Sequence, residues 1–189
     1  MKQTILIIAL MGLIYSCITN DKKINRFEQS ITLGQNIRTH DYDEKTGWIR
    51  ILLNEPYNWG YIDKDSNVVI PFIFERLNRF DSAGMALGRL EGKDGFINTN
   101  CDTVIPFIYD NLSVFNIGIA RAEMIGKIGF INRKGETIIP FKYDKAHGFI
   151  DCGIAQVSLN NKWGFINTVG EIVIPLIYSD VDYHRKDSL

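Results

Sequence analysis

The residues best suited to acid–base or metal chemistry in this sequence are its three histidines, His40, His147 and His184. A catalytic centre requires reactive groups that converge at one place, and none of the histidines has a partner at the spacing of metal ligands. His147 alone falls inside the repetitive part of the chain, near Asp144 and Asp151. These three residues support an alternative interpretation, a hydrolase of the cell envelope or its accessory subunit. The main prediction is a protein that is not an enzyme, with no catalytic residue, no metal site and no cofactor.

Four acidic or amide residues recur at nearly equal spacing and could be read as a row of ligands. They are Asp63, Asn98, Asn132 and Asn167. Each stands just before a predicted turn, where Asp and Asn side chains hydrogen-bond to the nearby backbone. We therefore interpret all four as turn residues. The glycines of the chain also lack the spacing of a phosphate-binding loop.

The composition favours a folded module. The chain has 189 residues, of which 46% are hydrophobic and 12% aromatic, which suits the core of one ordinary domain. Its 21 Lys and Arg residues balance 22 Asp and Glu residues, and the net charge of -1 comes without a basic stripe. Because phosphate contacts need clustered positive charge, we predict that nucleic acid is not a partner.

The first seventeen residues differ from the rest. Lys2 precedes an apolar stretch from Thr4 to Leu13, and Ile14-Tyr15-Ser16-Cys17 follows. A bilayer-spanning helix needs roughly 20 apolar residues, so this shorter stretch is typical of a signal peptide. Its end resembles a bacterial lipobox, which implies that residues 1–16 are removed and that Cys17 carries acyl chains such as palmitate. An ordinary secretory signal or an uncleaved anchor is the alternative.

The sequence contains two further cysteines, Cys101 and Cys152. If the chain is exported and anchored as predicted, both lie in an oxidising compartment. An even pair there is compatible with a disulfide. The two residues occupy unrelated positions, one in a predicted turn and one in a connection. Sequence alone does not fix their separation, so both the bridge and two free thiols stay open, and free thiols are favoured.

An internal repeat organises most of the chain. Four motifs align at offsets of 35, 34 and 35 residues, and eleven residues after each motif glycine stands a proline preceded by Ile. The motifs are Trp59-Gly60-Tyr61-Ile62-Asp63, Asp94-Gly95-Phe96-Ile97-Asn98, Ile128-Gly129-Phe130-Ile131-Asn132 and Trp163-Gly164-Phe165-Ile166-Asn167, and the prolines are Pro71, Pro106, Pro140 and Pro175. Periods of 20–50 residues indicate stacked repeat architectures.

This pattern resembles the WG, or KWG, repeat family of bacterial proteins. Lys162-Trp163-Gly164-Phe165-Ile166-Asn167, followed by Ile174-Pro175, is the best match to its core. The resemblance covers roughly residues 47 to 180 and implies a β-rich repeat, usually without a catalytic site. Asp94 and Ile128 depart from the pattern because the family usually has Trp at these positions.

Each repeat is predicted to contain three short antiparallel strands. Apolar and charged residues alternate over Ile119 to Met124, which indicates a half-buried first strand. The motif forms the second strand, which starts near Trp59, Asp94, Ile128 and Trp163. A β-branched and aromatic third strand follows, as in Thr137 to Tyr143. Gly126-Lys127 and Asn160-Asn161 are predicted hairpin turns.

The repeated Trp, Gly and Pro residues are predicted to be structural. Glycine inside a strand marks a close approach, and proline marks an edge or a bulge, because it cannot donate to the ladder. The residues in question are Trp59, Gly60, Pro71, Gly95, Pro106, Gly129, Pro140, Trp163, Gly164 and Pro175.

The predicted fold class is therefore all-β, an open tandem array of three-stranded units that stack to form a core. A small β-propeller is the alternative. The boundaries we assign are residues 1–16 for the signal peptide, 17–46 for an N-terminal linker and cap, 47–180 for four repeats (about 47–75, 80–110, 115–144 and 149–180), and 181–189 for a polar tail.

The sequence predicts a membrane-anchored lipoprotein of the bacterial cell envelope whose repeats act as a binding or scaffolding module. The membrane, through the lipid anchor, and a protein of unknown identity are the expected partners. Connections between repeats vary most and are the expected recognition segments, because loops on a repetitive framework tolerate variation. These segments are Leu77 to Ala83, Leu112 to Ile117 and Ala146 to Cys152.

Overall fold

The computed structural model describes residues 37–179, and every regular element in this range is a β-strand. The predicted all-β fold class is confirmed. No helix among the described residues is long and apolar enough to cross a bilayer. Cys17, the predicted signal peptide and His184 lie outside the described residues.

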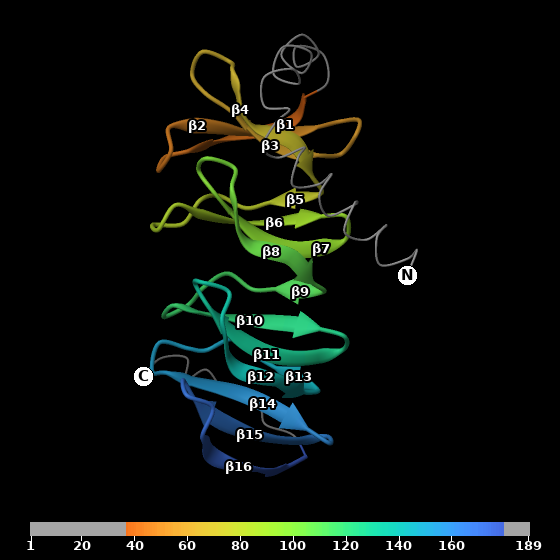
Figure 1. Ribbon diagram of the computed structural model, residues 1–189, viewed down its shortest axis with the longest axis vertical. Helices are drawn as coiled ribbons and strands as arrows, with labels where there is room; N and C mark the ends of the chain where they lie inside the picture. Colours follow the sequence, from red (N-terminus) through yellow and green to blue (C-terminus); the bar gives the residue numbers. More distant parts are fainter. Residues whose placement is uncertain (1–36, 180–189) are drawn as a thin grey trace, which may run out of the picture. The chain divides into compact units, whose positions relative to one another are not determined.

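Within residues 37–179, sixteen strands form four antiparallel sheets, each an open row of four strands in chain order (Figure 1). The first sheet contains β1 (Ile37–Asp43), β2 (Trp48–Leu53), β3 (Trp59–Ile62) and β4 (Val68–Phe74). The second contains β5 (Arg76–Leu77), β6 (Met85–Leu90), β7 (Lys93–Asn98) and β8 (Thr103–Tyr109). The third contains β9 (Asn111–Leu112), β10 (Ile119–Met124), β11 (Lys127–Asn132) and β12 (Thr137–Tyr143). The fourth contains β13 (Lys145–Ala146), β14 (Ile154–Leu159), β15 (Lys162–Asn167) and β16 (Ile172–Tyr178).

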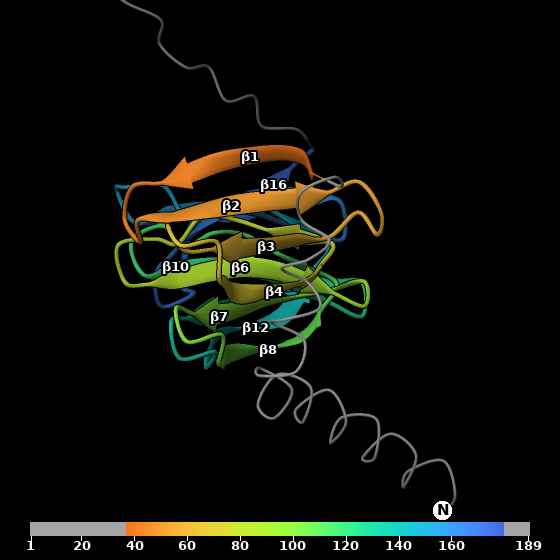
Figure 2. The ribbon, with the colours of Figure 1, turned by 90° about the horizontal axis from the view of Figure 1, so that it is seen from above.

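The three predicted strands of each repeat are present, and each sheet gains a fourth. In three sheets the extra strand has only two residues, which is too short to show an alternating pattern. In the first sheet it is β1, which lies at the outer edge beside β2 (Figure 2). Residues 37–43 fall within the predicted N-terminal linker and cap, and in the structure most of their side chains are exposed. They are part of the first sheet.

Two-residue hairpins join the central strands of the last three sheets. Both central residues have positive φ, as in the type I′ turn that matches strand twist. Asn160 and Asn161 form one of them, as predicted. The turn in the third sheet is Ile125-Gly126, because Met124 pairs with Lys127. The predicted turn at Gly126-Lys127 was therefore wrong by one residue, since the exposed Ile125 carries no sequence signal for a turn.

The motif glycines lie where two strands of one sheet come close. A Cβ atom on Gly60, Gly95 or Gly129 would meet the carbonyl oxygen of the isoleucine before the aligned proline at 2.7 Å. The prolines stand in β4, β8, β12 and β16, each of which is an edge strand. Register shifts interrupt the pairing with β4, β12 and β16. Glycine leaves room for the bend of the neighbouring strand.

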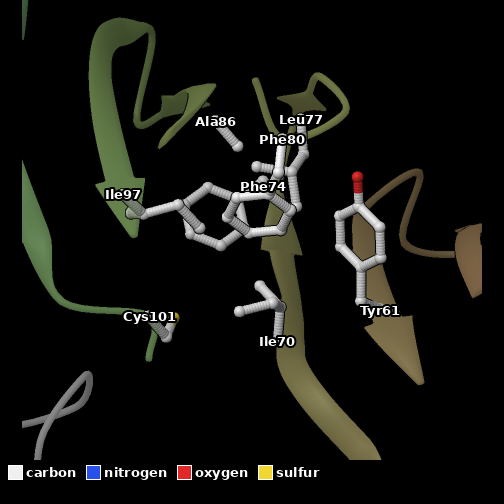
Figure 3. Packing of buried hydrophobic residues seen from close by; sticks show 8 residues of the cluster. All are labelled: Tyr61, Ile70, Phe74, Leu77, Phe80, Ala86, Ile97 and Cys101. Atoms are coloured by element: carbon white, nitrogen blue, oxygen red, sulfur yellow. The ribbon is translucent and has the colours of Figure 1, made fainter. Parts of the chain in front are cut away.

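The described residues divide into two compact units, one up to Phe107 and one from Ile108 onward. In the first unit, side chains of the first two sheets share one core, which Figure 3 shows. Its buried residues are Tyr61, Ile70, Phe74, Leu77, Phe80, Ala86, Ile97 and Cys101.

In the second unit, the third and fourth sheets share an equivalent core. Its buried residues are Ile128, Phe130, Ile139, Tyr143, Phe149, Ala155, Val157 and Ile166. In both units a small side chain, Ala86 or Ala155, stands on the sheet that receives the aromatic residues of its neighbour. Small residues at this position allow the two sheets to pack closely.

Candidate binding surface

The first residue of the motif has the same place in every sheet, but its type and its contacts differ from one repeat to the next. Trp59 is half-buried, and the guanidinium of Arg50 lies 4.4 Å from the centre of its ring. Trp163 is also half-buried and stacks on His147 at 6.0 Å between ring centres. Ile128 is buried in the core of the second unit. The structure thus places both tryptophans against the sheet, with only part of each ring reaching the surface.

Asp94 fills the same position with a buried charge. Its side chain is fully buried, and its carboxylate accepts hydrogen bonds from Arg76 Nη2 at 2.8 Å and Arg89 Nη1 at 3.0 Å. Both arginines remain partly exposed, so their charges are solvated on one side. Since a buried carboxylate without partners is costly, the arginines explain how the second repeat tolerates Asp where the others carry apolar residues.

A second buried carboxylate, Asp43, holds the turn between β1 and β2 against the core. Its Oδ2 accepts hydrogen bonds from the hydroxyl of Tyr61 and the backbone N–H of Phe80, both at 3.2 Å. Burial, together with the negative charge of Asp43, raises the pKa of Tyr61 well above its ordinary value. Tyr61 therefore stays protonated and acts as a donor. The sequence analysis missed Asp43 because it lies in a segment without a repeat counterpart.

Asp41 bridges two arginines beside this site. Arg50 donates to both oxygens of Asp41, at 2.9 and 2.8 Å, and Arg79 Nη2 donates at 3.0 Å. Burial alone would raise the pKa of Asp41, but the hydrogen bonds and charges of Arg50 and Arg79 outweigh it and lower the pKa below 3.8. The carboxylate is thus held in its charged form.

We expect Asp41 to make the first unit sensitive to acid. Because its pKa is lower in the folded chain than in the unfolded chain, the stability it adds is complete above pH 3.8 and is lost as the pH falls through the folded pKa. The Tm difference between the wild type and Asp41→Asn should be largest near neutral pH and shrink in acid. Thermal melts across this range measure it, with the exposed Asp65→Asn as control. A difference that does not vary with pH would contradict the assignment.

The recurring Asp63, Asn98, Asn132 and Asn167 cap the turn after the motif strand. In each case the side-chain Oδ1 accepts hydrogen bonds from the backbone N–H groups two and four residues later, at 2.8 to 3.2 Å. In each residue the Oδ1 atom, which a ligand site would use, already accepts two backbone hydrogen bonds. The described residues also contain no group of three or more His, Cys, Asp or Glu side chains that could hold a metal ion.

The two acids of the alternative hydrolytic site have other hydrogen-bond partners in the structure. Asp144 accepts hydrogen bonds from Lys127 Nζ at 2.6 Å and from the backbone of Asn160 at 2.7 Å, and Lys127 lowers its pKa. Asp151 accepts from Asn116 at 3.1 Å. Within residues 37–179, no hydrogen bond joins the side chain of His147 to either carboxylate. His40 lies apart from these residues in the sequence, on the exposed strand β1.

Within residues 37–179, neither Cys101 nor Cys152 forms a disulfide. Cys101 is buried in the core of the first unit, in a turn where its φ is 66°. Cys152 is exposed in the connection before β14. The favoured sequence interpretation, without a bridge, agrees with this arrangement.

The predicted recognition segments are ordered connections between the short and the long strands. Phe80 and Phe149 are buried and fix two of these connections to the cores. In the second unit the connections before β10 and β14 are tied to each other, because Asn116 Nδ2 donates to Phe149 O at 2.9 Å and to Asp151 Oδ1 at 3.1 Å. Sequence reasoning missed this link, since the aligned residues of two other repeats are Asp81 and Ile150, and no Asn recurs at this position.

Three apolar side chains are exposed on the two linked connections. Val114 is 59% exposed, Ile117 is 45% exposed and Ile150 is 37% exposed. Exposed apolar side chains on neighbouring connections are candidates for contact with another protein. We name Val114, Ile117 and Ile150, with Asn116 between the connections, the linked-loop surface.

The sheets and the motif geometry define a tandem β-repeat protein. Residues 59–93, 95–127, 128–163 and 163–184 match the WG containing repeat, which covers more than half of the chain. The chain belongs to this family. Each match begins at the motif strand, so one repeat supplies strands to two sheets: residues 59–93 hold β3 and β4 of the first sheet and β5 and β6 of the second.

Two solved structures that resemble part of this chain come from a yeast and from a bacterium. Hsv2 of Kluyveromyces lactis is 10% identical, with a TM-score of 0.48, over 73% of this chain and 50% of that chain. The extracellular domain of BT4673 from B. thetaiotaomicron is 14% identical, with a TM-score of 0.45, over 72% of this chain and 23% of that chain. The chain thus spans half or less of the length of these proteins. No curated protein matches the sequence.

Proposed function

We propose that this chain is a non-catalytic lipoprotein of the bacterial cell envelope whose WG repeats bind a protein partner. The observation that carries the proposal is the linked-loop surface. The hydrogen bonds of Asn116 hold two connections together, and exposed apolar side chains stand on both. A surface that is already ordered loses little conformational entropy on binding, which favours affinity.

The chemistry of this surface favours a protein over a small polar ligand. Val114, Ile117 and Ile150 offer apolar area, and the nearby polar groups are largely engaged with one another. Asn116 donates to Phe149 and Asp151, and Ser113 Oγ donates to Val114 O while accepting from Arg121 N. Apolar area surrounded by satisfied polar groups is the usual anatomy of a protein interface.

We expect binding to depend on Val114 and Ile117. The tagged chain is used as bait in a cross-linking pull-down from envelope fractions, beside a Val114→Lys/Ile117→Lys double variant. Because two lysines place charge in the apolar contact, the double variant should lose the captured protein. Ile125→Lys is the matched control: Ile125 is 88% exposed, at the tip of a hairpin in the same unit. Equal recovery with all three chains would contradict the proposal.

The membrane anchor rests on the lipobox, Ile14 to Cys17, at the end of the apolar stretch. A single acyl chain gives only marginal membrane binding, whereas two or three chains hold a protein stably. We expect a palmitate analogue to label the wild-type chain and to leave Cys17→Ala unlabelled. Label that persists in Cys17→Ala would disprove the anchor without bearing on the repeats.

A further inference from the structure

The side of the first sheet that faces away from the second sheet carries an apolar cluster of its own, and we name this side the outer face. Its buried residues are Ile51, Ile62, Val68 and Phe72. Ile51 is 1% exposed and Phe72 is 4% exposed. A fully buried side chain touches roughly 6–12 other residues, more than one side of a single sheet supplies. The outer face therefore has a cover, although within residues 37–179 the cluster contains residues of β2, β3 and β4 alone.

The equivalent side of the second and fourth sheets is covered by the preceding sheet of the same unit. The residues that align with Ile51, Ile62 and Phe72 in the second sheet belong to the core that the first two sheets share; they are Ala86, Ile97 and Phe107. Those of the fourth sheet belong to the core of the second unit; they are Ala155, Ile166 and Leu176. Within residues 37–179 no sheet precedes the first, so its outer face needs a different cover.

Ile51 shows that this cover is not another sheet of the same type. The aligned residues of the other three repeats are alanines, Ala86, Ala120 and Ala155. Ala86 and Ala155 leave room for the aromatic rings of the preceding sheet. Isoleucine is much larger than alanine, and extra methylene groups in a packed core displace their neighbours. A further repeat, from this chain or from a second copy, would therefore fit poorly on the outer face.

The segment before β1 has the residues that a cover requires. Ile24, Phe27 and Ile31 recur at spacings of three and four, which places them on one side of a helix. All residues between them are polar. Gly34 follows, and glycine is typical just after the end of a helix. The pattern predicts an amphipathic helix over residues 21–33 with one apolar stripe.

We propose that residues 21–33 cover the outer face of the first sheet, with their apolar stripe against the apolar cluster of that face. This inference goes beyond the binding function proposed above and depends neither on that function nor on the lipid anchor. A repeat array needs a terminal cap, because the outer side of its first unit has no neighbour. Residues 21–33 supply this cap and close the outer face to a second copy of the chain.

The place of this segment in the chain suits the proposed contact. Ile31 stands six residues before Ile37, the first residue of β1, and six extended residues reach about 20 Å. Neighbouring strands lie about 5 Å apart and packed layers about 10 Å apart. The stripe can therefore reach the middle of the outer face from the edge strand β1.

The other stretches outside the described residues suit the outer face less well. In residues 180–189 the apolar side chains are Val181, Tyr183 and Leu189, which do not recur at helical spacing. The apolar stretch from Thr4 to Leu13 belongs to the predicted signal peptide, which is removed. Residues 21–33 remain as the stretch with an apolar stripe.

The test compares hydroxyl-radical labelling of Phe72 and Phe74 in the whole purified chain, read by tandem mass spectrometry. Phe72 lies on the outer face, whereas Phe74 lies in the core shared with the second sheet and reports global unfolding. Both should be protected in the wild type. Phe27→Asp should raise the labelling of Phe72 several-fold and leave that of Phe74 unchanged, because the charge removes the stripe from the outer face.

Gln29→Asp is the matched control, because it adds the same charge on the polar side of the segment. It should label like the wild type. Phe27→Leu should also protect Phe72, because it keeps an apolar side chain in the contact. If Phe27→Asp exposes Phe74 as well, the milder pair Phe27→Ala and Gln29→Ala makes the same comparison in folded chains.

Three results would overturn the proposal. The first is equal labelling of Phe72 in the Phe27 and Gln29 variants. The second is a rise in Phe72 labelling on Tyr183→Asp in place of Phe27→Asp, which would identify residues 180–189 as the cover. The third is labelling of Phe72 that falls as the wild-type concentration rises, which would identify a second copy of the chain.

Discussion

The double variant Arg76→Met/Arg89→Met is expected to lower the free energy of unfolding of the first unit by about 3–5 kcal/mol, the usual cost of breaking a buried ion pair. The substitutions remove both cations from Asp94, which is fully buried. The carboxylate loses the two charge-assisted hydrogen bonds that now offset its burial. Urea unfolding followed by the fluorescence of Trp48 and Trp59, which both belong to the first unit, measures the loss.

The matched control adds Asp94→Ile to the same double variant. Isoleucine stands at the aligned position of the third repeat, Ile128, where it is buried. Replacing a complete buried ion cluster by apolar residues is often neutral or stabilising, so the triple variant should recover most of the lost stability. If the triple variant is as unstable as the double variant, the arginines act through other contacts, such as those of Arg89 with Glu75 and Gly92, and not through Asp94.

The second large effect is expected for Gly129→Ala, which should destabilise the second unit by about 2–3 kcal/mol, towards the upper end for overpacking. The added Cβ would lie 2.7 Å from Ile139 O and 3.0 Å from Phe141 N. Both are backbone atoms in a paired strand, so neither can rotate away. The fluorescence of Trp163, the tryptophan of the second unit, reports the unfolding.

Gly148→Ala adds the same methyl group in the same unit. A Cβ there meets nothing within 4 Å, and the residue is not in the left-handed region. We expect a change within about 0.5 kcal/mol, as for isolated surface substitutions. Equal losses for the two alanine variants would show that the motif glycine is not required by the close approach of β12.

The sequence predicted those parts of the fold that recur in every repeat. The start of the motif strand, the turn chemistry of Asp63 and its counterparts, and the all-β class follow from periodicity and from local side-chain hydrogen bonding. The roles of Gly60 and Pro71 could be stated in outline, because strand glycine and edge proline have few physical reasons to recur.

Features that occur once could not be predicted in this way. β1 has a polar, exposed sequence, and its place in the sheet depends on pairing with β2 and not on its own pattern. The buried charges of Asp43 and Asp94 depend on partners up to 37 residues away. The linked-loop surface depends on one side chain, Asn116, whose partners lie 33 and 35 residues further along the chain. Contacts that occur only once produce no repeating pattern in the sequence.

The division of each repeat between two sheets has a consequence for how such genes can change length. Residues 59–93 end one sheet with β3 and β4 and begin the next with β5 and β6. An in-frame duplication of this segment therefore places a second β3 and β4 directly after β5 and β6, which completes a new four-stranded sheet. Deletion of a whole repeat likewise joins two half-sheets of matching strand order. Unequal recombination can thus vary the number of sheets without creating an unpaired half-sheet at the junction.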